Sequence, residues 1–238
     1  MISMSKSKMT IYKDRQGEVL MKKILFFAVA VIMCACASAF AADEATSFVR
    51  QFTDEALNGI LAKPVPLEKK ADMFGDLFEK CTSLDTIASF ALGRKIKSLS
   101  PEEKERFKKV FKENLILMWT LRFAEYNDQH FEFVGEKVSD NGKDVFVSSK
   151  VVSADNAADP PIDVVWRIRK DKNGKLMVID IVISNISMLK TYQTEYASFL
   201  NRNGGDINEL ISLLESKNAA YRADIKAADT GKKADAGK

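Results

Sequence analysis

The chain has 238 residues, of which 36 are Lys or Arg, 33 are Asp or Glu and one is His, and its formal net charge is +3. Residues 1–41 hold six basic and two acidic side chains, so the remainder has 30 basic against 31 acidic residues and a net charge of −1. Nucleic-acid binding depends on clustered positive charge. This near-neutral, mixed surface therefore argues against a nucleic-acid partner.

Residues 21–41 have the order of a secretory signal. Met21 and two lysines precede an apolar run, and Ala39-Phe40-Ala41 gives the small-x-small pattern that signal peptidase reads. The run is shorter than the roughly 20 residues that span a bilayer, and no later stretch comes closer. We expect cleavage between Ala41 and Ala42 and a soluble mature chain. Because residues 1–20 are mostly polar, Met21 is the expected start.

Two of the three cysteines, Cys34 and Cys36, lie inside the signal, and only Cys81 remains after cleavage. An internal disulfide is therefore excluded. The alternative to cleavage after Ala41 is a lipoprotein anchored through acylated Cys36. The residues before Cys36 fit the lipoprotein pattern poorly, whereas Ala39-Phe40-Ala41 fits the cleavage pattern well.

The expected organisation is an N-terminal extension and signal (1–41), one folded domain (42–222) and a disordered tail (223–238) that is rich in Ala, Lys, Asp and Gly. A first helix is predicted over 43–61 from apolar residues every four positions, and Pro64 and Pro66 bar its continuation.

Three more helices follow in the first half of the chain. They are predicted over 67–80, over 84–92 with a stop at Gly93, and from Ser100 to about Tyr126. Ser100-Pro101-Glu102-Glu103 combines a helix cap, a proline in the first turn and a capping box.

The hydrophobic period changes from helical to two after Gln129. Strands are predicted over 131–138, 144–152, 162–169 and 175–183, and the first two flank the turn Asp140-Asn141-Gly142. Two helices, over 188–201 and 206–221, close the domain. The predicted fold class is α+β, with a helical N-terminal half packed on a four-stranded antiparallel sheet and two C-terminal helices.

This order of elements, together with several short motifs, resembles the MlaC family, also called the toluene-tolerance auxiliary family, from about residue 46 to residue 214. The motifs that carry the resemblance are Leu84-Asp85 through Leu92-Gly93-Arg94, Ser100-Pro101-Glu102-Glu103 with Phe107 and Phe111, Ile179-Asp180-Ile181 followed by Ile186-Ser187-Met188, and Gly205-Asp206-Ile207 with Leu210. The chain departs from the family at Leu176, Asn185 and Gln193, which puts lipid preference and partner contacts in doubt.

The resemblance implies a non-enzymatic periplasmic carrier of phospholipid that maintains the lipid asymmetry of the outer membrane. The implied partners are an outer-membrane lipoprotein and porin complex and an inner-membrane ABC lipid transporter. Phospholipid is the implied cargo, and no cofactor is expected. Two alternatives stay open: a ligand-free periplasmic adaptor, and a carrier associated with hopanoid export.

The resemblance also implies a pocket between helices and sheet. Residues 115–119 are apolar around the whole helix, and apolar strand faces carry Trp166 and Phe131. Ordinary core packing is the alternative role for such side chains, and we expect about half of the candidates to contact lipid. The candidates are Phe90, Phe111, Leu115, Met118, Trp119, Phe131, Phe133, Val147, Val164, Trp166, Ile168, Ile181, Ile183, Met188 and Tyr192.

Polar residues offer little catalytic chemistry. The single histidine, His130, is predicted to lie in a surface turn. Cys81 follows Lys80, which is expected to lower its pKa slightly, but no partner base is evident. Motifs of hydrolases and metalloproteases are absent from the sequence. Asp180 is predicted to fix a strand end, and Arg94 and Arg122 are candidates to contact a phosphate, with a plain surface role as the alternative.

Overall fold

The computed structural model describes residues 44–124, 129–153 and 160–235. The predicted signal, its cleavage site and the expected start at Met21 lie outside these residues, as does the predicted end of the long helix near Tyr126. The first helix covers residues 44–61, and its last seven residues form the π-helical segment η1 (Glu55–Leu61). The remaining helices are α2 (Leu67–Cys81), α3 (Leu84–Leu92), the 3₁₀ segment η2 (Gly93–Ser98), α4 (Pro101–Ala124), α5 (Met188–Arg202) and α6 (Ile207–Asp235).

Five strands form one antiparallel sheet in the order β1-β2-β3-β4-β5. Their bounds are β1 (Gln129–Val138), β2 (Asp144–Ser153), β3 (Ile162–Lys170), β4 (Leu176–Ile183) and β5 (Ile186–Ser187). The predicted α+β class is confirmed, with one more strand than predicted. The fifth strand has only two residues, because Ser184 and Asn185 take positive φ angles of 47° and 66° and turn the chain straight back onto β4. Such a short segment leaves no alternation for sequence analysis to detect.

The predicted capping box at the start of α4 is confirmed. The backbone N–H of Ser100 donates to Glu103 Oε2 (2.8 Å), and the N–H of Glu103 donates to Ser100 Oγ (3.1 Å). Further along, buried Asn114 of α4 donates to the side chain of Asn218 in α6 (2.8 Å), and Asn218 donates to the carbonyl of Val110 (3.0 Å). These directional bonds set the register of the two helices.

Helix α6 is longer than predicted. Composition predicted a disordered tail from residue 223, but the helix continues to Asp235. The reason is tertiary: Ile225 is buried against Leu67 and Leu117, and Asp229 accepts hydrogen bonds from the backbone N–H groups of Leu67 (2.6 Å) and Glu68 (3.1 Å). Asp229 thereby supplies the N-terminal cap that α2 lacks locally.

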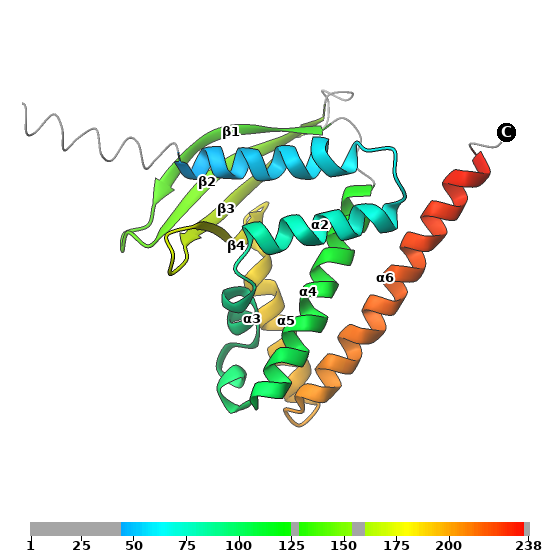
Figure 1. The fold of residues 1–238 in the computed structure, drawn as a ribbon. Coiled ribbons are helices and arrows are strands. Elements are labelled where there is room, and N and C mark those ends of the chain that lie inside the picture. The colour runs from blue at the N-terminus through cyan, green and yellow to red at the C-terminus, as the bar shows by residue number, and fades with distance from the viewer. Residues whose placement is uncertain (1–43, 125–128, 154–159, 236–238) are drawn as a thin grey trace, which may run out of the picture. The chain divides into compact units, whose positions relative to one another are not determined.

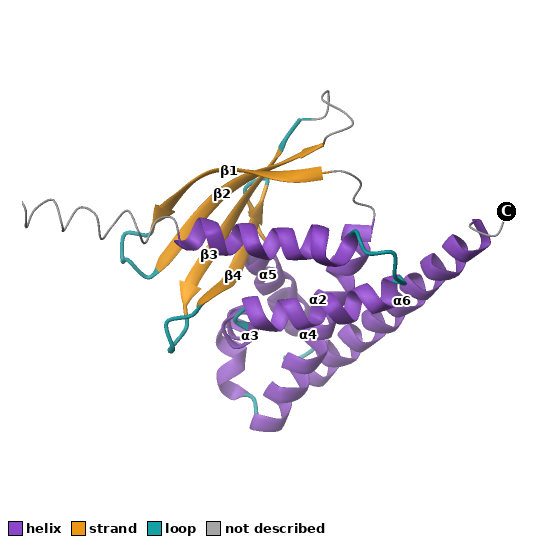
Figure 2. Cartoon of the chain, turned by 45° about the horizontal axis from the view of Figure 1, so that its top comes forward, coloured by secondary structure: helices purple, strands orange, loops and turns teal. Residues whose placement is uncertain are grey.

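Three apolar clusters pack the described residues, and two of them are large. A helical core gathers residues of α2 to α6 around Phe107 and Phe111. A second core lies between the first helix and the sheet, where Val49 and Phe52 meet Val164 and Trp166. Figures 1 and 2 show the first helix running across the face of the sheet and α4, α5 and α6 leading away from it. Val164, Trp166 and Ile168 alternate along β3 and are all buried, so they share one face of the strand.

Candidate functional site: an apolar cavity between helices and sheet

A cavity of about 240 Å³ lies between the sheet, the first helix, α2 and α4. Every lining residue except Thr82 and Arg122 is apolar. The lining residues are Phe52, Phe74, Phe78, Thr82, Trp119, Arg122, Phe123, Phe131, Val151, Ile162, Val164, Trp166, Val178, Ile181 and Ile183. The site therefore favours hydrocarbon over a polar ligand.

Aromatic rings form much of the cavity wall. Trp166 on β3 meets Phe52 of the first helix edge to face, with ring centroids 5.8 Å apart, and meets Phe131 of β1 at 5.7 Å. On the helical side Phe123 contacts Phe74 at 5.7 Å and stacks on Trp119 at 5.4 Å. Rings are rigid and wide, so they hold the two walls apart and leave space between them.

Trp166 and Thr82 form their side-chain hydrogen bonds within the protein. Trp166 Nε1 donates to Ser149 Oγ (3.0 Å), and Thr82 Oγ1 donates to the carbonyl of Phe78 (2.7 Å). A ligand in the cavity consequently meets few free hydrogen-bonding groups.

A smaller cavity of about 50 Å³ adjoins the first one on the side of α3 and α5. The residues that line both are Phe78, Thr82, Trp119, Val178 and Ile181. Tyr192 lines the smaller cavity, and its hydroxyl lies 3.8 Å from Met118 Sδ. Burial raises the pKa of Tyr192 well above its usual value, so the phenol stays neutral.

Arg122 is the only charged residue that lines the larger cavity among the described residues. Its side chain is exposed, and its guanidinium carbon lies 5.8 Å from the centroid of the Trp119 ring. It forms no ion pair within the described residues. The other arginine considered, Arg94, lies exposed in η2 and lines neither cavity.

Asp180 holds the turn between β4 and α5, as predicted. Its Oδ2 accepts from Ser187 Oγ (2.6 Å), and its Oδ1 accepts from the backbone N–H groups of Ile181 (2.9 Å) and Leu189 (3.0 Å). Ser187 in turn caps α5 by accepting from the N–H of Lys190. The carboxylate is thus fully used in fixing the start of α5 beside the smaller cavity.

The structure brings nine of the fifteen candidate residues to the two cavities. Six line the larger one: Trp119, Phe131, Val164, Trp166, Ile181 and Ile183. Leu115, Met188 and Tyr192 line only the smaller one. The remaining six line neither, and they are Phe90, Phe111, Met118, Phe133, Val147 and Ile168.

The residues outside the cavities have other surroundings. Phe111 is fully buried in the helical core, and Val147 of β2 and Ile168 of β3 are fully buried in the core between the first helix and the sheet. Phe90 is 41% exposed at the end of α3. The Phe133 ring lies under the guanidinium of Arg50 at 4.5 Å. Met118 is half-buried and contacts Tyr192.

Sequence analysis missed the contribution of the first helix and α2. Phe52, Phe74 and Phe78 recur at helical spacing, which marks an apolar face but does not tell which neighbour the face meets. Val151 and Val178 lie in predicted strands and were likewise not singled out.

Cys81 and His130 are the two residues that were considered for catalysis. Cys81 is half-buried, and burial raises the pKa of its thiol despite nearby Lys175 and Lys80, so the direction expected from Lys80 alone was wrong. His130 lies exposed in β1, 3.6 Å from Glu132. Within the described residues, no group of three His, Cys, Asp or Glu side chains is placed to hold a metal ion.

Known proteins resemble this chain over most of its folded part. The family model described as MlaC protein matches residues 48–216. The intermembrane phospholipid transport system binding protein MlaC of Haemophilus influenzae is 28% identical over 125 residues, which cover 52% of this chain and 58% of that protein. The toluene tolerance protein ttg2D of Pseudomonas putida is 28% identical over 112 residues, covering 47% and 50% of the two chains.

A solved structure shares the fold. It is a phospholipid-binding protein from Ralstonia solanacearum, determined in complex with a phospholipid. The TM-score is 0.66 at 24% identity, and the match covers 75% of this chain and 98% of that one. The chain spans only 58% and 50% of the length of the two curated relatives. Because the family match covers well over half of its residues, the chain belongs to the MlaC family.

Proposed function

We propose that the protein is a carrier that takes phospholipid acyl chains into the apolar cavity and transfers the lipid between membranes. The observation that carries the proposal is the hollow, almost wholly apolar space between the first helix, α2, α4 and the sheet. Support comes from the relatives, one named as a phospholipid transport binding protein and one solved with a phospholipid.

The energetics of lipid transfer require such a space. Each acyl CH₂ group gains about 0.8 kcal/mol on leaving water, so a two-chain lipid cannot cross an aqueous compartment unshielded at a useful rate. A cavity that is about as favourable as a bilayer lowers this barrier. Exchange then makes and breaks no covalent bond, and we propose that the protein needs no catalytic group or cofactor.

The cavity must widen to hold a whole lipid. Its volume of about 240 Å³ is below the roughly 300–1,000 Å³ of most ligand sites. Trp119 and Ile181 line both cavities, so a shift of the Trp119 side chain would join them. We propose that loading moves Trp119 and Phe123 and separates the helical wall from the sheet.

Arg122 is proposed to bind the lipid phosphate. It places a permanent positive charge beside an otherwise apolar cavity and has no anionic partner among the described residues. A phosphodiester offers the missing negative charge at any physiological pH, whereas diacylglycerol does not. The same acyl chains would therefore bind more weakly without the phosphate.

Membership of the family supports a compartment and a set of partners. We propose that the protein works in the periplasm, between an outer-membrane lipoprotein and porin complex and an inner-membrane ABC lipid transporter, and that it maintains outer-membrane lipid asymmetry. The signal-like residues 1–41 support export. Among the described residues, none of the helices is both long and apolar enough to cross a bilayer.

Native mass spectrometry with lipid extraction, on protein purified from periplasm without detergent, tests the proposal. We expect a discrete added mass that matches a phospholipid. A protein that stays free of lipid after incubation with liposomes would contradict the carrier and favour an adaptor. An added mass of a hopanoid would change the cargo.

Competition between phospholipid and diacylglycerol of equal chain length tests Arg122. Wild type and Arg122→Lys should prefer the phospholipid, and Arg122→Gln should lose most of that preference while still binding acyl chains. Arg94→Gln is the matched control, since Arg94 is exposed and lines neither cavity. An unchanged preference in Arg122→Gln would remove the proposed phosphate contact.

A further inference from the structure

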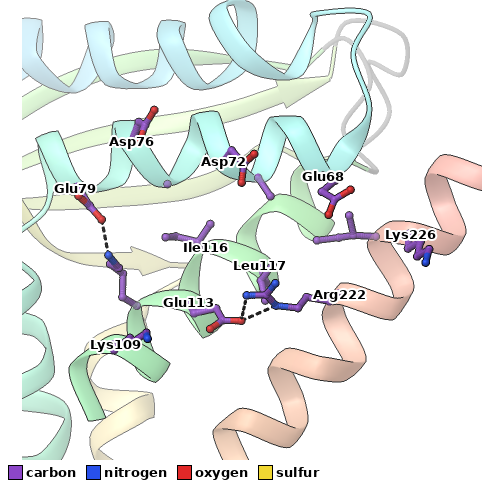
Figure 3. A pocket seen from close by; sticks show the side chains of 14 residues that line it. Glu68, Asp72, Asp76, Glu79, Lys109, Glu113, Ile116, Leu117, Arg222 and Lys226 are labelled. Carbon is purple, nitrogen blue, oxygen red and sulfur yellow. Dashed lines mark hydrogen bonds and ion pairs between the residues drawn. The ribbon is translucent and has the colours of Figure 1, made fainter. Parts of the chain in front are cut away.

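A second hollow, larger than the lipid cavity, lies between α2 and α6, with α4 as its floor (Figure 3). Its volume is about 670 Å³. Unlike the lipid cavity, this groove is lined mainly by charged side chains. They are Glu68, Asp72, Asp76, Glu79, Lys109, Lys112, Glu113, Arg222 and Lys226.

The α2 side of the groove is acidic. Glu68, Asp72, Asp76 and Glu79 line it, and their spacing of four, four and three residues places them along one face of the helix over about 16 Å. Glu79 pairs with Lys112. The side chains of the other three form no ion pair or hydrogen bond within the described residues, so they form an unneutralised acidic stripe.

The opposite side is basic. Arg222 and Lys226 of α6 line it, and Lys109 of α4 adds a positive charge on the floor. Arg222 is neutralised by Glu113, with its Nη2 2.6 Å and its Nε 2.7 Å from the same carboxylate oxygen. Neither Lys109 nor Lys226 has an anionic partner among the residues described. The groove thus presents opposite, unpaired charges on its two sides.

Small side chains line the groove along α2. Ala71 and Gly75 are one turn apart and face the groove. A Cβ at Gly75 would come only within 3.4 Å of Ile116, so the isolated fold accommodates alanine at this position. Glycine within a helix lowers its stability. A glycine at this position leaves room for the close approach of another backbone, as in packed helix pairs.

The basic side is built by residues beyond the family match. The match ends at residue 216, whereas Arg222, Ile225 and Lys226 lie on the later part of α6. The groove also uses other faces of α2 and α4 than the lipid cavity does, since Phe74 and Trp119 line the cavity and Asp72 and Ile116 line the groove. The two sites are therefore distinct.

We propose that this groove binds an α-helix of a partner protein that carries basic side chains along the edge facing α2 and acidic side chains along the edge facing α6. A helix is convex and fills the space between two helices above a third. A second copy of this face would set two concave surfaces against each other and leave a void. Charge complementarity on both edges gives the specificity.

The proposal can be tested by fluorescence anisotropy, with three synthetic 15-residue helical peptides that are titrated with the full chain at low salt. One has Lys along one edge and Glu along the other, one has Lys on both edges and one has Glu on both. Wild type should bind the mixed peptide at least tenfold tighter than the other two. In Asp72→Lys/Asp76→Lys the middle of the α2 side becomes basic, and the all-Glu peptide should become the tightest ligand.

Two further variants sharpen the test. Gly75→Leu keeps all charges but narrows the groove at α2, and should weaken the mixed peptide at least tenfold. Glu195→Lys/Glu215→Lys makes the same change in net charge at exposed positions outside the groove, and should leave the order of the three peptides unchanged. Circular dichroism verifies that each variant is folded.

Several results would overturn the proposal. Equal binding of the three peptides to wild type, or no binding at all, would show that the groove does not select a helix with one basic and one acidic edge. If Glu195→Lys/Glu215→Lys changed the order of the three peptides in the same way, net charge alone would explain the effect. A wild-type dimer that dissociates in Asp72→Lys/Asp76→Lys without any peptide would assign the groove to a second copy of this chain.

Discussion

The helical core and the region between the first helix, α4 and the sheet both contain aromatic and aliphatic side chains. The first region is densely packed, whereas the second encloses a cavity. Around Phe107 and Phe111, which stack at 5.3 Å and are fully buried, Tyr192 and Tyr196 fill the surrounding space edge to face. Between the first helix, α4 and the sheet, aromatic rings surround a cavity of about 240 Å³ instead. Apolar composition alone therefore does not decide whether a region is solid or hollow.

The geometry of the elements explains the difference. Helices pack ridge into groove, and between α4 and α5 the rings of Phe107 and Phe111 meet those of Tyr196 and Tyr192 edge to face. A twisted sheet and a helix have surfaces that diverge away from their line of contact. The rigid rings of Trp166 and Trp119 line the space that remains.

Truncation of Phe111 should give the largest effect. Phe111→Ala is expected to lower the free energy of unfolding by about 3–5 kcal/mol, because a fully buried ring leaves a void in a packed core. Phe52→Ala removes a ring that already borders empty space and should cost about half as much. Urea unfolding measures both, and equal losses would contradict the contrast between the two regions.

As the pH falls, the sheet should lose stability before the helical core does. Buried Asp144 accepts from Arg169 Nε (2.5 Å) and Arg167 Nε (2.9 Å). Burial raises the pKa of Asp144, but the hydrogen bonds from Arg169 and Arg167 outweigh it and hold the pKa below its usual 3.8. The pair between Asn114 and Asn218 in the helical region carries no charge.

The sign of the pH dependence follows from this lowered pKa. Stabilisation by Asp144 is fully present above pH 3.8 and is lost as the pH falls through the lower folded-state pKa. Asp144→Asn should cost about 1.5–3 kcal/mol at neutral pH, and this difference should shrink below pH 3.8. Hydrogen-exchange protection of β2 and β3 measures it. A difference that stays constant down to pH 2 would exclude the ion cluster as its source.

Tryptophan substitutions should distinguish densely packed positions of the sheet from positions that border the cavity. Ile168→Trp overpacks a fully buried site and should cost about 1–3 kcal/mol. Ile181→Trp points its larger ring into the cavity, so it should change stability by less than about 1 kcal/mol while reducing lipid occupancy at least tenfold. Thermal unfolding and native mass spectrometry give the two readouts. Similar stability losses at both positions would mean that the space near Ile181 is not available.

The helices and strands were largely predictable because their signals are local. Ser100 and Glu103 form the capping box that their spacing predicts, and the turns at Gly142 and Gly174 have the positive φ angles that glycine allows. The end of α6 was not predictable, since Ile225 and Asp229 act on α2, about 160 residues earlier in the chain.

The candidate site was predictable only in part. Trp166, Val164 and Trp119 are apolar residues on predicted faces, and they do line the cavity. Phe111 and Ile168 have the same character but lie in packed core. Alternation and helical period determine which face is apolar, and the choice between core and cavity depends on which elements meet there.

The sequence by itself determined the element order, the α+β class and the family resemblance, because caps, turns and hydrophobic period are encoded within a few residues of one another. Only the tertiary structure decided that Phe52, Phe74 and Trp166 surround a hollow space, that Arg122 stands beside it and that α6 extends to form a charged groove with α2. These features arise between segments far apart in the chain, where packing geometry and long-range hydrogen bonds outweigh local propensity.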